Sequence, residues 1–121
     1  MIKKKILICG ATGFIGRNIL ERFQKNKKYK IRALYHKRPI PKSRIITKVG
    51  KKNNVQWTRA NLTKTEDVKK VMNGIDIVLQ YAATTTGAAD IISKPYIHVT
   101  DNAVMNSLLL REAFEQKVKH F

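Results

Sequence analysis

Several residue types are scarce in this chain, and their scarcity excludes common classes of protein. Cys9 is the single cysteine among 121 residues, so the chain cannot form an internal disulfide. No apolar run approaches the roughly 18 residues of a membrane-spanning helix, and residues 1–5 lead into an apolar segment without the length of a signal peptide. We therefore expect a cytoplasmic protein without a membrane partner, and we identify no metal-binding residues.

Acidic residues are also scarce, since 8 Asp and Glu stand against 25 Lys and Arg, for a net charge of +17. The electrostatic field of such a net charge attracts polyanions of any kind, without specificity. The cations are spread from Lys3 to Lys119, however, and no aromatic stacking platform recurs between them. We do not expect nucleic acid as the partner, and a basic nucleic-acid-binding module stays an alternative.

The length allows one domain with a modest core, and the 43% share of hydrophobic residues is typical of a globular chain. A complete doubly wound dinucleotide fold needs two mononucleotide halves, and 121 residues supply little more than one. We therefore expect a fragment or a truncated product.

The chain is organised around a glycine-rich turn at residues 10–16. The continuous apolar run at residues 6–9 before it predicts a strand buried on both faces. Cys9 in this run is interpreted as a small buried hydrophobe, with a reactive thiol as the alternative. The sequence after the turn predicts an amphipathic helix over residues 14–24, with apolar residues at helical spacing: Ile15, Ile19, Leu20 and Phe23.

A strand, a glycine turn and a helix in this order favour dinucleotide binding over an ordinary tight turn. Gly10 allows a sharp turn, Gly13 leaves room for a pyrophosphate, and Gly16 allows the helix to pack closely on the sheet. The amides of the first helical turn then face the phosphates. The candidate cofactor-binding residues here are Gly10, Thr12, Gly13, Phe14, Ile15 and Gly16.

The second strand, predicted at residues 29–36, ends without the acidic residue that binds the ribose 2′-hydroxyl of NAD. At that place the sequence has His36, Lys37 and Arg38. Because two permanent cations suit a 2′-phosphate, we expect a preference for NADP(H), with NAD as the alternative cofactor. The competing interpretation is that both cations only add to a basic surface.

The rest of the chain predicts further strands at residues 55–58 and 75–81, and the first residues of a fifth strand at 117–121. Thr63 and Glu66 have the spacing of a capping box at the start of a helix that ends at residues 73–74. Val68, Val71 and Met72 supply its apolar face. A long helix should follow Pro95, with these residues among its buried positions: Val99, Ala103, Leu108, Leu110, Ala113 and Phe114.

The segment Gly10-Ala11-Thr12-Gly13-Phe14-Ile15-Gly16 has the GxxGxxG spacing of the short-chain dehydrogenase/reductase superfamily. With Phe14-Ile15 it resembles the extended branch, the NAD(P)-dependent epimerase/dehydratase family. The resemblance covers nearly the whole chain. It implies an α/β fold, a partial Rossmann-type doubly wound parallel sheet of about four strands, in the order third, second, first, fourth, with flanking helices. Residues 1–121 would be the N-terminal part of the dinucleotide-binding domain.

The same resemblance implies further cofactor contacts. Asn61-Leu62 stands where the family usually has Asp-Leu or Asp-Ile beside the adenine, and the alternative is a plain loop. Ala82, Ala83 and Thr84 resemble the small residues that let the cofactor pass, although they could equally serve packing. Asn102 resembles the family's helix Asn near the nicotinamide, and the alternative is a polar anchor to a neighbouring loop.

In this family a Ser or Thr, then a Tyr with a Lys four residues later, carries the reaction. None of these can be placed here, because Tyr81 and Tyr96 are followed at that spacing by Thr85 and Thr100. The resemblance implies a parent epimerase, dehydratase or reductase of a nucleotide-sugar, and within it the chain most resembles GDP-fucose synthases. We expect this chain to be inactive alone, without the substrate domain. The alternative is a non-catalytic NAD(P)-binding regulator.

A sheet that stopped at the fourth strand would leave the apolar residues 77–79 on an exposed edge. Such an edge invites pairing with another chain. We therefore expect either a homo-oligomer formed through this edge or aggregation.

Overall fold

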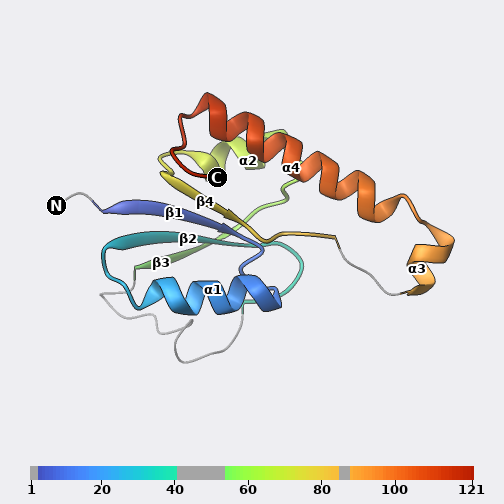
Figure 1. Cartoon of the computed structure of the whole chain (residues 1–121), viewed down its shortest axis with the longest axis horizontal. Helices are drawn as coiled ribbons and strands as arrows, with labels where there is room; N and C mark the ends of the chain where they lie inside the picture. Colours follow the sequence, from blue (N-terminus) through green and yellow to red (C-terminus); the bar gives the residue numbers. More distant parts are fainter. Residues whose placement is uncertain (1–2, 41–53, 85–87) are drawn as a thin grey trace.

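Four parallel strands form one sheet with helices on both of its faces (Figure 1). The computed structural model describes residues 3–40, 54–84 and 88–121. The strands are β1 (Lys4–Cys9), β2 (Tyr29–Tyr35), β3 (Val55–Arg59) and β4 (Ile77–Gln80). Their order in the sheet is β3-β2-β1-β4. The predicted strand order and α/β class are confirmed.

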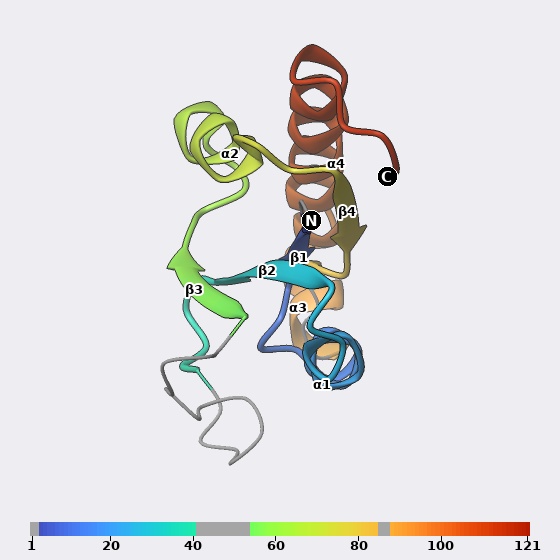
Figure 2. The same cartoon turned by 90° about the vertical axis from the view of Figure 1, so that its left-hand side faces the viewer.

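The helices are α1 (Phe14–Gln24), α2 (Thr65–Met72), α3 (Ala88–Ser93) and α4 (Ile97–Glu115). Helix α1 lies on one face of the sheet, whereas α2 and α4 lie together on the other (Figure 2). The bounds of α1 are those predicted from the sequence. No helix in the described ranges is long and apolar enough to cross a membrane, and no group of three or more potential metal ligands occurs within them.

Strand β1 is buried on both faces, which explains its continuous apolar run. Ile6 and Ile8 pack on the α1 side with Leu20 of that helix. Leu7 and Cys9 alternate with them and pack on the opposite side, in the larger cluster formed with α2 and α4. The helices on both faces of the sheet therefore pack on side chains of this one strand.

The buried face of α4 differs from the prediction. Ala113 is buried and Leu108 half-buried as expected, but Val99 and Phe114 are 71% and 83% exposed. Ala103 and Leu110 are exposed as well. Apolar residues occur on every side of this helix, so their spacing does not single out one face. The residues that are buried in α4 are Met105, Leu109, Glu112 and Ala113.

The predicted capping box at α2 is wrong. The Thr63 hydroxyl donates instead to Asn61 Oδ1 at 2.6 Å, and Lys64 is the N-cap residue, without a side-chain cap. Local bonds between Asn and Thr side chains compete with helix caps, which accounts for the difference. Val68, Val71 and Met72 are buried as predicted, and α2 is followed by Gly74 at φ +73°.

The last residues of the chain contact the edge of β4. The Val78 amide donates to His120 O at 2.8 Å, and Ile77 forms a parallel bridge with His120. This bridge agrees with the predicted start of a fifth strand. It also covers part of the edge that we expected to be exposed, and oligomerisation through that edge stays a prediction.

Candidate functional site

The turn between β1 and α1 brings backbone segments too close together for side chains at two of its glycines. Gly10 has φ +73°, and a Cβ atom there would lie 2.6 Å from the Ala82 nitrogen. A Cβ atom at Gly16 would collide with the Gly10 carbonyl oxygen. At Gly13, by contrast, a Cβ atom would meet only that oxygen, at 3.3 Å. Gly10 and Gly16 are therefore required for packing, whereas Gly13 keeps the outer surface of the turn open.

The N-terminus of α1 is open to a ligand. Gly13 is the N-cap residue and supplies no side-chain cap, and its amide donates back to Gly10 O at 3.0 Å. In a helix the next three amides, those of residues 14–16, have no acceptor within the helix. With the positive end of the helix dipole they suit an anionic group. Ile15, which we placed on the apolar helix face, is in fact exposed, as is Phe14.

The carboxyl ends of β2 and β4 flank this turn, and the end of β3 lies beside that of β2. The Ala11 amide donates to Leu34 O at the end of β2 (3.2 Å), and the Tyr81 amide after β4 donates to Cys9 O (3.1 Å). The Ala60 amide after β3 donates to Tyr35 O (2.9 Å). Because parallel strands share one carboxyl edge, the candidate segments at residues 10–16, 36–38, 61–62 and 82–84 lie along it (Figure 1).

The basic segment after β2 is accessible. Lys37 and Arg38 are exposed and His36 is half-buried. Their strand neighbours the glycine turn directly, since β1 and β2 pair in parallel register. The cations thus lie at the same edge of the sheet as the glycine turn, and their role in cofactor choice stays a prediction.

Asn61 and Leu62 have local structural roles. Asn61 Oδ1 accepts hydrogen bonds from the Thr63 amide (3.1 Å) and the Thr63 hydroxyl (2.6 Å), so the acceptor expected for the adenine is already engaged. The side chain of Leu62 is buried in the core, which leaves its backbone as the part that could face a ligand. Their contact with the adenine stays a prediction.

Two polar side chains hold the segment after β4. Asn102 Oδ1 accepts from the Thr84 amide at 2.7 Å, and its Nδ2 donates to His98 O at 2.6 Å and to Thr84 O at 3.3 Å. Asn102 therefore anchors the neighbouring loop, and its place near the nicotinamide stays a prediction. Gln80, which sequence reasoning missed, accepts from the Ala82 amide at 2.9 Å and donates to Asn106 Oδ1 at 3.0 Å. The only feature of the sequence that could have indicated this role is the position of an amide side chain near the end of an apolar strand.

Replacing Asn102 with Leu should lower the free energy of unfolding by about 1–3 kcal/mol, because the Thr84 amide loses its side-chain acceptor. Hydrogen exchange should accelerate at that amide. Asn18, which makes one local bond to Phe14 O, is the control, and Asn18→Ala should cost less and leave exchange at Thr84 unchanged. Equal losses in the two variants would argue against an anchoring role.

Cys9 is completely buried, and burial raises the pKa of its thiol from 9.0 to about 12. The thiol is therefore protonated at neutral pH, where a nucleophilic cysteine needs its thiolate form. The small-hydrophobe interpretation is confirmed, because Cys9 packs in the core cluster beneath α2 and α4.

Solved structures share this fold. The X-ray structure of Pen from Bacillus thuringiensis is 26% identical, with a TM-score of 0.79, and the match covers 97% of this chain and 36% of that chain. A mutant UDP-glucuronic acid 4-epimerase from Bacillus cereus, in complex with UDP-4-deoxy-4-fluoro-glucuronic acid and NAD, is 25% identical (TM-score 0.73, coverage 96% and 37%). The UDP-glucose 4-epimerase from Bifidobacterium longum, in complex with NAD⁺ and UDP, is 21% identical and shows the shared fold alone (TM-score 0.78, coverage 95% and 35%).

The chain thus spans little more than a third of the length of each of these three structures. A search of curated proteins found no significant match. A sequence profile matches residues 6–121, which include the last four residues of β1, the glycine turn and the strands β2, β3 and β4. This chain belongs to the NAD dependent epimerase/dehydratase family.

Proposed function

We propose that this chain is the NADP(H)-binding portion of an extended short-chain dehydrogenase/reductase that acts on a nucleotide-linked sugar. Residues 1–121 would form the N-terminal part of its dinucleotide-binding domain. Family membership supports a nicotinamide dinucleotide cofactor, and two of the similar structures contain NAD with UDP or a UDP-sugar derivative. The likeness to GDP-fucose synthases and a cytoplasmic location stay predictions.

The observation that carries the proposal is the open turn between β1 and α1. The uncapped amides of residues 14–16 would bind the diphosphate, and Gly13 leaves space for it to approach. Lys37 and Arg38 would bind the 2′-phosphate of NADP. Asn102 and Gln80 would hold the segment at residues 82–84 in place beside the cofactor.

The bound nicotinamide would supply hydride exchange with the sugar. This chain's own residues would bind and orient the cofactor, and we assign none of them to proton transfer. Tyr81 and Tyr96 lack the lysine four positions later that the family's acid/base tyrosine has.

Calorimetric titration with NADP and NAD tests the proposal. We expect Gly13→Val to weaken dinucleotide binding at least about 100-fold, because the side chain occupies the space of the diphosphate. Gly13 has φ −76° and ψ 170°, which valine also adopts. Its Cβ atom would lie 3.3 Å from the Gly10 carbonyl oxygen, and valine is a poorer N-cap residue than glycine, so the free energy of unfolding should fall by about 1–2 kcal/mol.

Gly74→Ala is the control, because Gly74 lies in the connection between α2 and β4, away from the turn. It should leave cofactor affinity unchanged. If neither nucleotide bound the unmodified protein while single-stranded RNA bound with a steep salt dependence, the cofactor proposal would be wrong and the nucleic-acid alternative favoured.

A further inference from the structure

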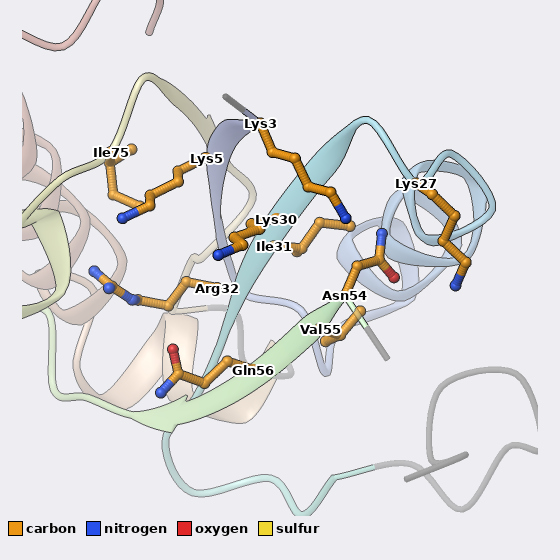
Figure 3. Close-up of a pocket in the computed structure, with 10 residues that line it drawn as sticks. All are labelled: Lys3, Lys5, Lys27, Lys30, Ile31, Arg32, Asn54, Val55, Gln56 and Ile75. Carbon is orange, nitrogen blue, oxygen red and sulfur yellow. The ribbon is translucent and has the colours of Figure 1, made fainter. Parts of the chain in front are cut away.

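A second basic region lies at the opposite edge of the sheet, where the strands begin. A hollow of about 650 Å³ opens there between the first residues of β1, β2 and β3 (Figure 3). We call it the amino-edge pocket. None of its described lining residues is acidic or aromatic, and five are cationic: Lys3, Lys5, Lys27, Lys30 and Arg32.

The strand register places like charges beside each other in this pocket. Lys5 of β1 is the direct partner of Lys30 of β2, and Arg32 follows two residues later on the same face. Leu7 and Leu34, which continue that face, are buried beneath α2 and α4. Like charges paired directly across strands destabilise a sheet. The fold therefore places two exposed ammonium-bearing side chains next to each other here, with the guanidinium of Arg32 on the same face.

The pocket wall is held in position by hydrogen bonds. Arg32 Nη1 donates to Val71 O at 2.6 Å and to Asn73 O at 3.0 Å, so the guanidinium is fixed at the end of α2. Asn54 Nδ2 donates to Tyr29 O at 3.0 Å. The Asp76 carboxylate accepts from the backbone amide of Lys5 at 2.8 Å, and Asp76 does not line the pocket. Lys5 and Lys30 are exposed side chains that line this open hollow (Figure 3).

We propose that the amino-edge pocket binds a compact oligophosphate, a small anion with several linked phosphate groups. Several phosphates would offset the repulsion among the lysines, which one monovalent anion could not do. The absence of aromatic residues from the described lining disfavours recognition of nucleic acid bases, which stack on such side chains. This proposal does not depend on the cofactor function of the glycine turn.

Titration of the ¹⁵N-labelled protein with tripolyphosphate, followed by amide chemical shifts, locates the binding. We expect the amide chemical shifts of residues 5, 30 and 54 to change and to reach a plateau as the tripolyphosphate concentration rises. The double variant Lys5→Gln/Lys30→Gln should weaken this binding about tenfold, as expected for the loss of charge-assisted bonds. The matched control, Lys69→Gln/Lys70→Gln, removes the same charge from exposed positions on α2 and should leave the affinity within about twofold.

A stability measurement separates this role from a purely structural one. In low salt without ligand, Lys30→Gln should raise the melting temperature by about 1–5 °C, because it relieves the repulsion from Lys5. When tripolyphosphate is added, the melting temperature of this variant should rise by less than that of the unmodified protein.

Three results would overturn the proposal. Shifts confined to residues 13–16 would assign the anion to the glycine turn. Equal weakening by both double variants would show an unspecific effect of net charge. Tighter binding of single-stranded RNA than of tripolyphosphate at the same residues would replace the compact ligand with a nucleic acid.

Discussion

Replacing Gly16 with alanine is expected to lower the free energy of unfolding by about 3 kcal/mol. The new methyl group would collide with the Gly10 carbonyl oxygen and lie 2.7 Å from the Gly10 carbonyl carbon. Both atoms belong to the backbone, so no side-chain rotation relieves the contact, and α1 must move away from the sheet. Urea unfolding followed by circular dichroism measures the loss.

Gly74→Ala is the matched control for this experiment. Gly74 also has φ +73°, but a Cβ atom there would meet only the Lys5 side chain, no closer than 3.5 Å. The substitution should therefore lower the free energy of unfolding by only about 1–2 kcal/mol, because alanine is disfavoured in the left-handed backbone conformation. A loss at Gly16 no greater than at Gly74 would show that the close approach of α1 to the turn is not needed for stability.

Replacing Lys37 and Arg38 together with serine is expected to weaken NADP binding about 30-fold or more. The substitution would remove two charge-assisted bonds to the 2′-phosphate. Because Lys37 and Arg38 are exposed, solvent reduces the binding free energy that each bond contributes. NAD lacks this phosphate, so its affinity should change by no more than about twofold. Competition titrations with the two nucleotides at fixed ionic strength measure the change in preference.

The control again removes two cations, at Lys69 and Lys70, which lie on α2 rather than after β2. It should leave the ratio of NADP to NAD affinity unchanged. If the double substitution at Lys37 and Arg38 proved neutral, the basic pair would be surface charge, and the preference for NADP would have to come from elsewhere on the carboxyl edge.

The elements around the glycine turn could be predicted because each has a strong local signal. The apolar run, the glycines at fixed spacing and the amphipathic segment that follows them together predicted the observed bounds of α1. The strand order followed from the resemblance to a known fold. The convergence of four strand ends at one edge then follows from parallel pairing.

Other features depend on contacts that a local pattern does not contain. Helix α4 has apolar residues on all sides, so only its packing against α2 and the sheet selects Met105 and Leu109 as buried residues. The helix α3 has only six residues, too few to show a helical period in the sequence, and none of them is buried. The bond between Gln80 and Asn106 joins residues 26 positions apart, and the Lys5–Lys30 pairing needs the strand register.

The length of β1 sets the distance between the glycine turn, at the carboxyl ends of the strands, and the amino-edge pocket at their amino ends. Its six residues span about 20 Å, whereas the screening length in physiological salt is about 8 Å. An anion at one edge is therefore largely hidden, electrostatically, from an anion at the other. At physiological ionic strength, two negatively charged molecules could therefore be bound at once with little mutual repulsion, and their repulsion would weaken binding only in dilute buffer.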